Sequence, residues 1–201
     1  TNQLGIAEDL IKLEPTVIGG MYPSHMEDRV LLNWPEVPPI LVDTILAVED
    51  QNFFNHYGIS LKSISRAFLR NVQAGEVEQG GSTITQQLAK SLFFSSEQTI
   101  RRKVLEAIAS LIIETRYSKE EILLAYINDV FLAQSGKRAI HGFGMGAQHF
   151  FGTSIQNLST DQVALLVGML KGPSFYNPRR NPNNATKRRN LVLRVLNNSN
   201  K

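Results

Sequence analysis

The chain has 201 residues, of which 42% are hydrophobic and 19% charged, so it can form one sizeable core and is too weakly charged to be largely disordered. It has no cysteine, which excludes a disulfide framework and thiolate metal sites, and no apolar run of about 18 residues, so we expect no membrane-spanning helix. The net charge of +3 suits a nucleic acid, an anionic membrane surface or a phosphorylated substrate without choosing among them. The chain starts at Thr1 without a signal peptide, and we interpret it as a fragment of a longer protein.

Apolar periodicity predicts a mainly α-helical fold, with one domain over residues 39–201 and a linker over residues 1–38 that could hold a short hairpin. No repeat and no alternating β pattern competes. Serine followed by Gln or Glu at the third position predicts helix N-termini at Ser95, Ser118 and Ser159. The expected helices cover about 39–49, 60–74, 82–94, 95–116, 118–132, 145–151, 159–172 and 184–197, the last capped by Asn184.

The stretch "EDQNFFNHYG" places an acidic pair at the end of the first expected helix. Glu49 shares a helical face with Val42 and Leu46, so it points toward the apolar side, where desolvation raises the pKa of a carboxyl. A raised pKa suits a general acid or base, although a helix-end Glu can also bend to solvent or pair with a Lys. His56 could act as a ligand or base, or be a hydrogen-bonded core residue; the other histidines form no metal spacing.

The stretch "GGSTITQQLAK" places two glycines and two hydroxyl groups at a helix N-terminus, where free N–H groups favour an anion or a polar sugar. The alternative is an ordinary N-cap followed by a solvated face. The expected polar face holds Thr83, Gln86, Gln87 and Lys90, opposite Ile84, Leu88 and Leu92.

In "RRKVLE", helical spacing brings Arg102 and Lys103 onto one face with Glu106. This pattern is an ion-pair cluster worth a few tenths of a kcal/mol, or a cationic clamp for phosphate oxygens with a carboxylate near a divalent ion. The local spacing alone favours the ion-pair cluster.

The expected helix over 60–74 carries a basic row beside an apolar row. Such a helix could lie on anionic lipid, or could be a core helix with a charged back. The basic row is Lys62, Arg66 and Arg70, and the apolar row is Leu61, Ile64, Phe68 and Val72; Leu92, Phe93 and Phe94 could extend the apolar surface.

"EDQNFFNHYG", "GGSTITQQLAK", "RRKVLE", "KEEILLAYIN" and "RRNLVL" together resemble, in order and spacing, the peptidoglycan glycosyltransferase domain of bifunctional class A penicillin-binding proteins. "LVDTILAVED", "QSGKRAIHGF" and "LLVGMLKGPSFYNPRRNP" are most similar to the 1b type of Gram-negative bacteria. The resemblance covers about residues 14–197; His149-Phe150 stands where relatives often have a Tyr pair. It implies a lysozyme-like α fold with a large head lobe and a small membrane-proximal jaw lobe at about 60–94.

The resemblance further implies that the domain polymerises lipid II, with Glu49 as general base, inversion at the donor anomeric carbon and release of undecaprenyl diphosphate. Lys90, Arg102 and Lys103 would stabilise the diphosphate, with Glu106 placing these cations or a diphosphate-bound Mg²⁺; no protein ligand binds metal directly. The matched motifs assign Glu49 and Glu106 to catalysis, and assign to substrate binding Asp50, Phe53, His56, Gly81, Ser82, Thr83, Gln86, Gln87, Lys90, Arg102, Lys103 and Asn128.

The implied setting is the periplasmic face of the bacterial inner membrane, with an N-terminal transmembrane anchor and a transpeptidase domain that this sequence lacks. The implied partners are lipid II, the growing lipid-linked glycan, an anionic membrane surface, the inhibitor moenomycin and other cell wall synthesis proteins, but no nucleic acid. One alternative is a lytic enzyme on the same fold, which would use one Glu as an acid and need no diphosphate clamp. Another is a non-catalytic basic module, which would need cations interleaved with aromatic residues.

Overall fold

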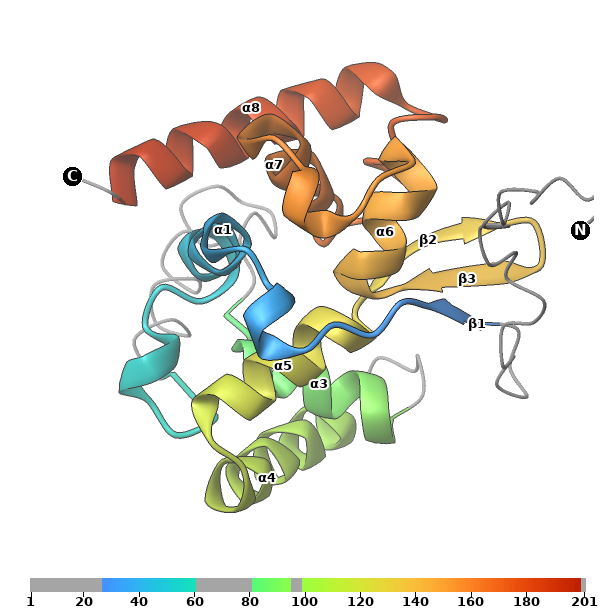
Figure 1. Cartoon of the computed structure of the whole chain (residues 1–201). Coiled ribbons are helices and arrows are strands. Elements are labelled where there is room, and N and C mark those ends of the chain that lie inside the picture. Colours follow the sequence, from blue (N-terminus) through green and yellow to red (C-terminus); the bar gives the residue numbers. More distant parts are fainter. Residues whose placement is uncertain (1–26, 61–80, 95–98, 200–201) are drawn as a thin grey trace, which may run out of the picture.

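The computed structural model describes residues 27–60, 81–94 and 99–199 (Figure 1). Helices dominate this part of the chain, which confirms the mainly α fold class. The elements are β1 (Glu27–Arg29), η1 (Trp34–Glu36), α1 (Pro39–Glu49), η2 (Phe53–Asn55), α3 (Ile84–Phe93), α4 (Ile100–Arg116), α5 (Lys119–Asp129), β2 (Phe131–Ser135), β3 (Arg138–His141), α6 (Gly142–Phe151), η3 (Ile155–Asn157), α7 (Thr160–Met169) and α8 (Pro182–Ser199).

Capping side chains set several helix starts. The capping boxes of Ser118 and Ser159 are confirmed, since their backbone N–H groups donate to Glu121 at 2.8 Å and to Gln162 at 2.9 Å. The start predicted at Ser95 is wrong. Thr99 has an extended backbone, with φ −119° and ψ 152°, and its hydroxyl oxygen caps α4 by accepting from the Arg102 N–H at 3.2 Å. The Ser95–Gln98 box itself lies outside the described residues.

The prediction that no β structure competes is wrong around "SGKRAIHGFGMG". Strands β2 and β3 pair antiparallel around Gly136, and β1 adds to β3 in parallel, with Arg29 opposite His141. Residues 27–38, expected to be linker or hairpin, therefore supply a strand of the sheet and η1; the rest of that expected hairpin and residues 61–74 of the expected second helix lie outside the described residues.

Glycines in α6 serve close packing rather than a loop. A Cβ on Gly144 would lie 2.5 Å from the Val30 carbonyl oxygen, and one on Gly146 would lie 2.4 Å from a methyl carbon of Leu132. The helix starts at Gly142, three residues before the prediction. The last helix also starts early: Pro182 is its first residue, a position that proline favours, so Asn184 is not its cap.

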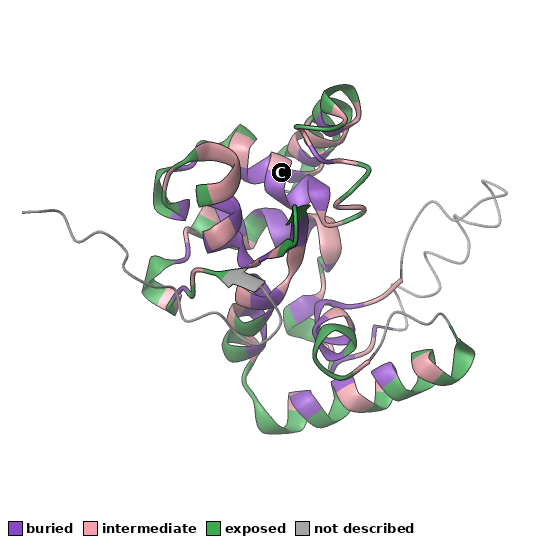
Figure 2. Cartoon of the chain, turned by 90° about the vertical axis from the view of Figure 1, so that its right-hand side faces the viewer, coloured by how far each residue is buried: buried purple, intermediate pink, exposed green. Residues whose placement is uncertain are grey.

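The helices share one core, in which α1, α7 and α8 pack together, α6 lies against the sheet, and α5 contacts both α6 and α3 (Figure 1). Helix α4 packs on α3 at the edge of the molecule, with its exposed side outward (Figure 2). Most of the segment assigned to the jaw lies outside the described residues, so the two lobes stay a prediction. The fully buried apolar side chains include Leu41, Ile45, Ile84, Ile122, Leu123, Ile127, Phe143 and Leu166.

Asn128 and Asp129 join the end of α5 to β1 and to the segment that follows it. The Asn128 Oδ1 accepts from the Leu32 N–H at 2.8 Å, and its Nδ2 donates to the Leu32 carbonyl at 2.9 Å. Asp129 pairs with Arg29 at 2.9 Å. Both ends of the Asn128 amide are thus engaged in the fold, and the assignment of Asn128 to substrate binding stays a prediction.

Candidate functional site

Glu49 is the last residue of α1 and lies partly buried, while Val42 and Leu46 on the same face pack against the core. Its Oε2 accepts a hydrogen bond from the Gln87 Nε2 of α3 at 3.0 Å. Burial raises the pKa of the Glu49 carboxyl, opposed by the Gln87 hydrogen bond and the positive charges of Arg188 and Lys171. The desolvated environment predicted from helical spacing is therefore present, and the carboxyl is suited to proton transfer.

Asp50 ties the loop after α1 to the start of α3. This carboxylate is only 3% exposed and accepts from the His56 Nε2 at 2.9 Å and from the Ile84 N–H at 3.2 Å. Phe53 is buried beneath, with the Lys119 ammonium 4.5 Å from its ring centre. Asp50, His56 and Phe53 thus hold the loop that follows Glu49, and His56 has the hydrogen-bonded structural role that the sequence left open for it.

The loop reaches α4 through a glycine. Gly58 has φ +74°, and a Cβ there would lie 2.8 Å from the Ser110 carbonyl carbon and oxygen. The Gly58 carbonyl accepts from the Thr83 hydroxyl at 2.6 Å. Because Thr83 is the N-cap of α3, this contact fixes the start of α3 against both α4 and the loop from Glu49.

The expected polar face of α3 is divided between two roles. Gln86 is buried in the capping box, where its Oε1 accepts from the Thr83 N–H at 3.0 Å, whereas Gln87 faces Glu49 and Lys90 is exposed. The prediction of a solvated face is wrong for Thr83 and Gln86, because capping turns these side chains back to the helix backbone. On the opposite side of α3, Ile84 and Leu88 are buried, whereas Leu92 is 52% exposed.

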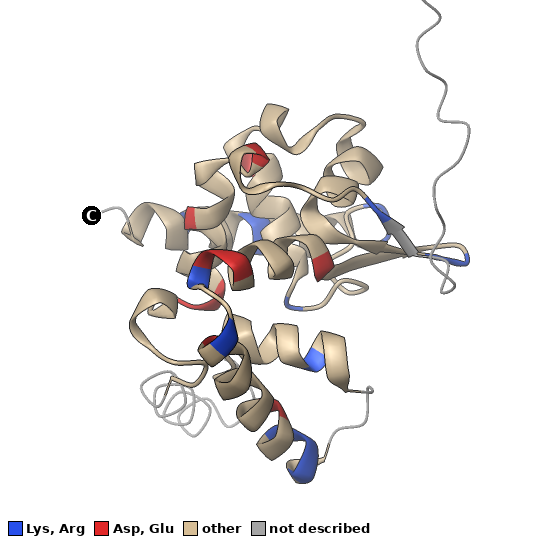
Figure 3. Ribbon diagram, turned by 60° about the horizontal axis from the view of Figure 1, so that its bottom comes forward, with Lys and Arg blue, Asp and Glu red and all other residues tan. Residues whose placement is uncertain are grey.

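Glu106 gathers two cations at the start of α4. It is fully buried, with its Oε1 2.8 Å from the Arg102 Nε and its Oε2 2.7 Å from the Lys103 Nζ. Lys103 also donates to the Ser82 hydroxyl oxygen at 2.9 Å, and its side chain is 51% exposed. The predicted ion-pair cluster is confirmed, and it joins the segment Gly81–Ser82 that leads into α3. Basic and acidic residues accordingly lie together at the start of α4 (Figure 3).

The Glu106 carboxylate does not fit as a direct Mg²⁺ ligand, because both oxygens already face cations in a buried setting. Across residues 27–60, 81–94 and 99–199, no three His, Cys, Asp or Glu side chains converge as a metal-binding group.

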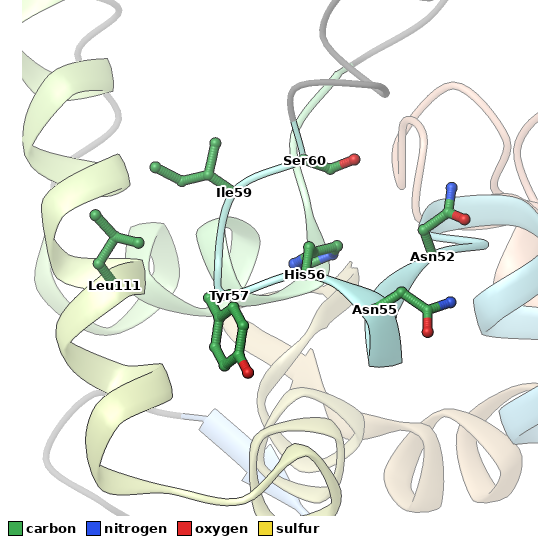
Figure 4. Close-up of a pocket in the computed structure, with 7 residues that line it drawn as sticks. All are labelled: Asn52, Asn55, His56, Tyr57, Ile59, Ser60 and Leu111. Atoms are coloured by element: carbon green, nitrogen blue, oxygen red, sulfur yellow. The ribbon is translucent and has the colours of Figure 1, made fainter.

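A cavity of about 640 Å³ opens between the loop after α1 and helix α4 (Figure 4). Of the residues that line it, only His56 is among the predicted site residues; Asn52 and Asn55 could have been found from the same stretch, "EDQNFFNHYG". The lining residues are Asn52, Asn55, His56, Tyr57, Ile59, Ser60 and Leu111.

Comparison with known proteins gives consistent matches. A family model described as "Transglycosylase" matches residues 15–197. Penicillin-binding protein 1B of Escherichia coli is 51% identical over 185 residues, covering 92% of this chain and 22% of the relative. The proteins of that name from Vibrio cholerae and Haemophilus influenzae are 50% and 48% identical, covering 92% and 97% of this chain and 24% and 26% of the relatives. The chain thus spans about a quarter of the length of these relatives.

Proposed function

Since the chain belongs to the transglycosylase family and is similar to penicillin-binding proteins 1B, we propose that it polymerises lipid II into the glycan strands of peptidoglycan. One observation carries this proposal. Helix α3 meets a partly buried carboxyl of raised pKa through Gln87 and meets a two-cation cluster through the segment at its N-terminus. Helix α3 thus brings together a base on α1 and a cationic cluster on α4, which are the two parts that this reaction needs.

Glu49 acts as the general base in the proposed reaction. It takes the proton from the 4-hydroxyl of the incoming lipid II sugar as that oxygen attacks the anomeric carbon of the growing chain. Such proton transfer contributes roughly 10²–10⁴-fold to the rate. Attack from the side opposite the diphosphate inverts the anomeric configuration, and the undecaprenyl diphosphate leaves.

The leaving diphosphate is already anionic, so it needs electrostatic stabilisation rather than an acid. Lys103 is half exposed beside Ser82, and Lys90 is exposed on α3, so both ammonium groups can reach phosphate oxygens. Glu106 is buried and acts by holding Arg102 and Lys103 in place. A Mg²⁺ ion would be held by the diphosphate rather than by Glu106, and no step above depends on it. The phosphoglycolipid moenomycin would occupy the same donor half.

The membrane-facing surface is proposed to include α4. This helix exposes apolar side chains along one side, and α3 adds two at its end; none of the helices within the described residues is long and apolar enough to cross a bilayer. We place the domain at the periplasmic face of the inner membrane, in a longer anchored protein that works with other cell wall synthesis proteins. The exposed residues are Leu92, Phe93, Ile100, Val104, Leu105, Ile108, Leu111 and Ile112.

Incubation with labelled lipid II, followed by gel separation of the products, tests the proposed function. Polymer supports it. Small muropeptides released from preformed peptidoglycan would instead identify a lytic enzyme, and no product with either substrate would favour a binding module.

A further inference from the structure

Gln87 of α3 lies between side chains from two other helices, Glu49 of α1 and Tyr126 of α5. Its Nε2 donates to the Glu49 Oε2 at 3.0 Å, and its Oε1 accepts from the Tyr126 hydroxyl at 3.1 Å. The three side chains form a chain of hydrogen bonds that starts in the core and ends at the carboxyl group of Glu49.

While Glu49 is ionised, only one orientation of the Gln87 amide satisfies both of these hydrogen bonds. A carboxylate has no proton to donate, so it needs the amide nitrogen, and the amide oxygen is left for Tyr126. A tyrosine hydroxyl can satisfy that oxygen because it donates. Tyr126 is only 2% exposed, so solvent offers its hydroxyl no ready alternative to this bond.

Tyr126 also keeps its proton. Burial first, and the negative charge of Glu49 second, raise the pKa of Tyr126 well above its ordinary value. Both effects favour the protonated hydroxyl, which can donate a hydrogen bond.

We propose that Tyr126 is a positioning residue for Glu49, acting through Gln87, an inference that rests on the function proposed above. The Tyr126 hydroxyl holds the Gln87 amide with its nitrogen toward the carboxylate. This donor favours the ionised form of Glu49, the form that a base needs. Without the hydroxyl, the amide is free to turn its oxygen toward Glu49, which favours the protonated carboxyl.

Other charges around Glu49 come from three places. Asp50 follows it in the chain and raises the pKa of its carboxyl, whereas Arg188 of α8 and Lys171 after α7 lower it. None of them takes part in the hydrogen bonds between Gln87 and Tyr126. A change at Tyr126 therefore isolates the contribution of the amide orientation.

The direct test is the pKa of Glu49, measured by carbon-13 NMR on protein with labelled glutamate carboxyls and assigned from the signal missing in Glu49→Gln. We expect Tyr126→Phe to raise the titration midpoint by up to about one pH unit, the equivalent of one net hydrogen bond. Gln87→Leu should raise it as well, and adding Tyr126→Phe to Gln87→Leu should raise it no further. Tyr117→Phe, at a residue 58% exposed, is the matched control and should change nothing.

An unchanged midpoint in Tyr126→Phe, or a double variant that moves by the sum of the single shifts, would overturn the proposal. An unchanged midpoint in Gln87→Leu alone would do the same, so the test survives a Tyr126→Phe variant that folds poorly. In lipid II polymerisation, the acid limb of the plot of kcat against pH should move to higher pH in Tyr126→Phe, with KM unchanged. If the wild type made no polymer, the proposed function would fail while the NMR titration still decided the inference.

Discussion

At the scale of single residues, Glu49 and Glu106 show two ways of burying a carboxylate. Glu106 is fully buried between a guanidinium and an ammonium group. Glu49 has an amide as its hydrogen-bond partner, and desolvation dominates its pKa. The Glu106 carboxylate, whose charge is compensated by two cations, is suited to holding those cations in place. The Glu49 carboxyl, whose charge is less fully compensated, is suited to exchanging a proton.

The raised pKa of Glu49 predicts that its charge costs stability. A carboxyl whose pKa is higher in the folded state stabilises the protein below its ordinary value of 4.5, and this contribution is lost as the pH rises through the folded pKa. Glu49→Gln should therefore raise the melting temperature at pH 7, and the gain should vanish near pH 4. Thermal unfolding across this range measures it.

Glu121 is the matched control, because hydrogen bonds from the Ser118 backbone and hydroxyl lower the pKa of its carboxyl. Its contribution is present above the ordinary pKa and is lost as the pH falls, so Glu121→Gln should slightly lower the melting temperature at pH 7. If both variants shifted the melting temperature in the same direction at pH 7, the assignment of opposite environments would be wrong.

Removing either cation that pairs with Glu106, Arg102 or Lys103, should impair use of the lipid-linked donor more than use of the lipid II acceptor. Lys103→Ala should affect catalysis with little effect on the fold, since Glu106 keeps its ion pair with Arg102. Arg102→Ala removes the more buried of the two cations from a buried carboxylate and should also lower stability. The measurement compares turnover as the preformed lipid-linked chain is varied with turnover as the lipid II acceptor is varied. Arg116→Ala, at the exposed end of α4, is the control. Equal losses for donor and acceptor would contradict the placement of the diphosphate.

At the scale of elements, the start of α3 is the junction on which the site depends. Its N-cap Thr83 binds the Gly58 carbonyl, its first N–H binds Asp50, and the preceding Ser82 binds Lys103. The loop from Glu49, the helix with the cations and α3 are thereby held in one arrangement.

Gly58→Ala should be strongly destabilising, because a side chain there meets both a left-handed backbone and the carbonyl of Ser110. Left-handed geometry alone costs about 1–2 kcal/mol, and the backbone clash adds to it. Gly136→Ala separates the two effects, since Gly136 has φ +59° and an alanine methyl group there would have nothing within 4 Å. Equal losses of unfolding free energy in urea for the two variants would show that the contact with α4 does not matter.

The local elements were predictable where side chains cap their own helix, as at Ser118 and Ser159. The sheet was not, because β1 pairs with β3 across more than a hundred residues and its strands are too short to show alternation. In the site, the apolar side of α1 located Glu49, and the i, i+3 and i, i+4 spacings located the Glu106 cluster. The partners of Gln87 come from α1 and α5, and no periodicity within α3 reveals them.

At the scale of the whole molecule, the exposed apolar side of α4 lies at the edge of the fold, next to the exposed end of α3 (Figures 1 and 2). The lipid tail of the proposed substrate stays in the bilayer, so the site has to work at the membrane surface. Of the apolar residues expected to be exposed on α3, Leu92 and Phe93 are confirmed. The exposed apolar side of α4 was not predicted from the sequence, because an exposed apolar side has the same periodicity as a buried one.

Co-sedimentation with anionic liposomes tests this surface. We expect salt-sensitive binding that is weakened in a Val104/Ile108/Ile112→Ser variant and in a Lys62/Arg66/Arg70→Ser variant, each cation near the surface contributing about 1 kcal/mol. A Leu31/Phe175→Ser variant changes apolar residues outside α4 that are at least as exposed, and it should bind normally. Failure of the wild type to bind at low salt would remove the proposed membrane surface.

The most direct test of the central claim is the rate of lipid II polymerisation by Glu49→Gln, measured beside the wild type at one pH and one substrate concentration. Glutamine keeps the size and the hydrogen-bond acceptor that Gln87 needs, but it cannot take a proton. We expect a loss of at least about 10²-fold, with the fold and lipid II binding retained. A variant that kept more than about a tenth of the wild-type rate would contradict the assignment of Glu49 as the general base.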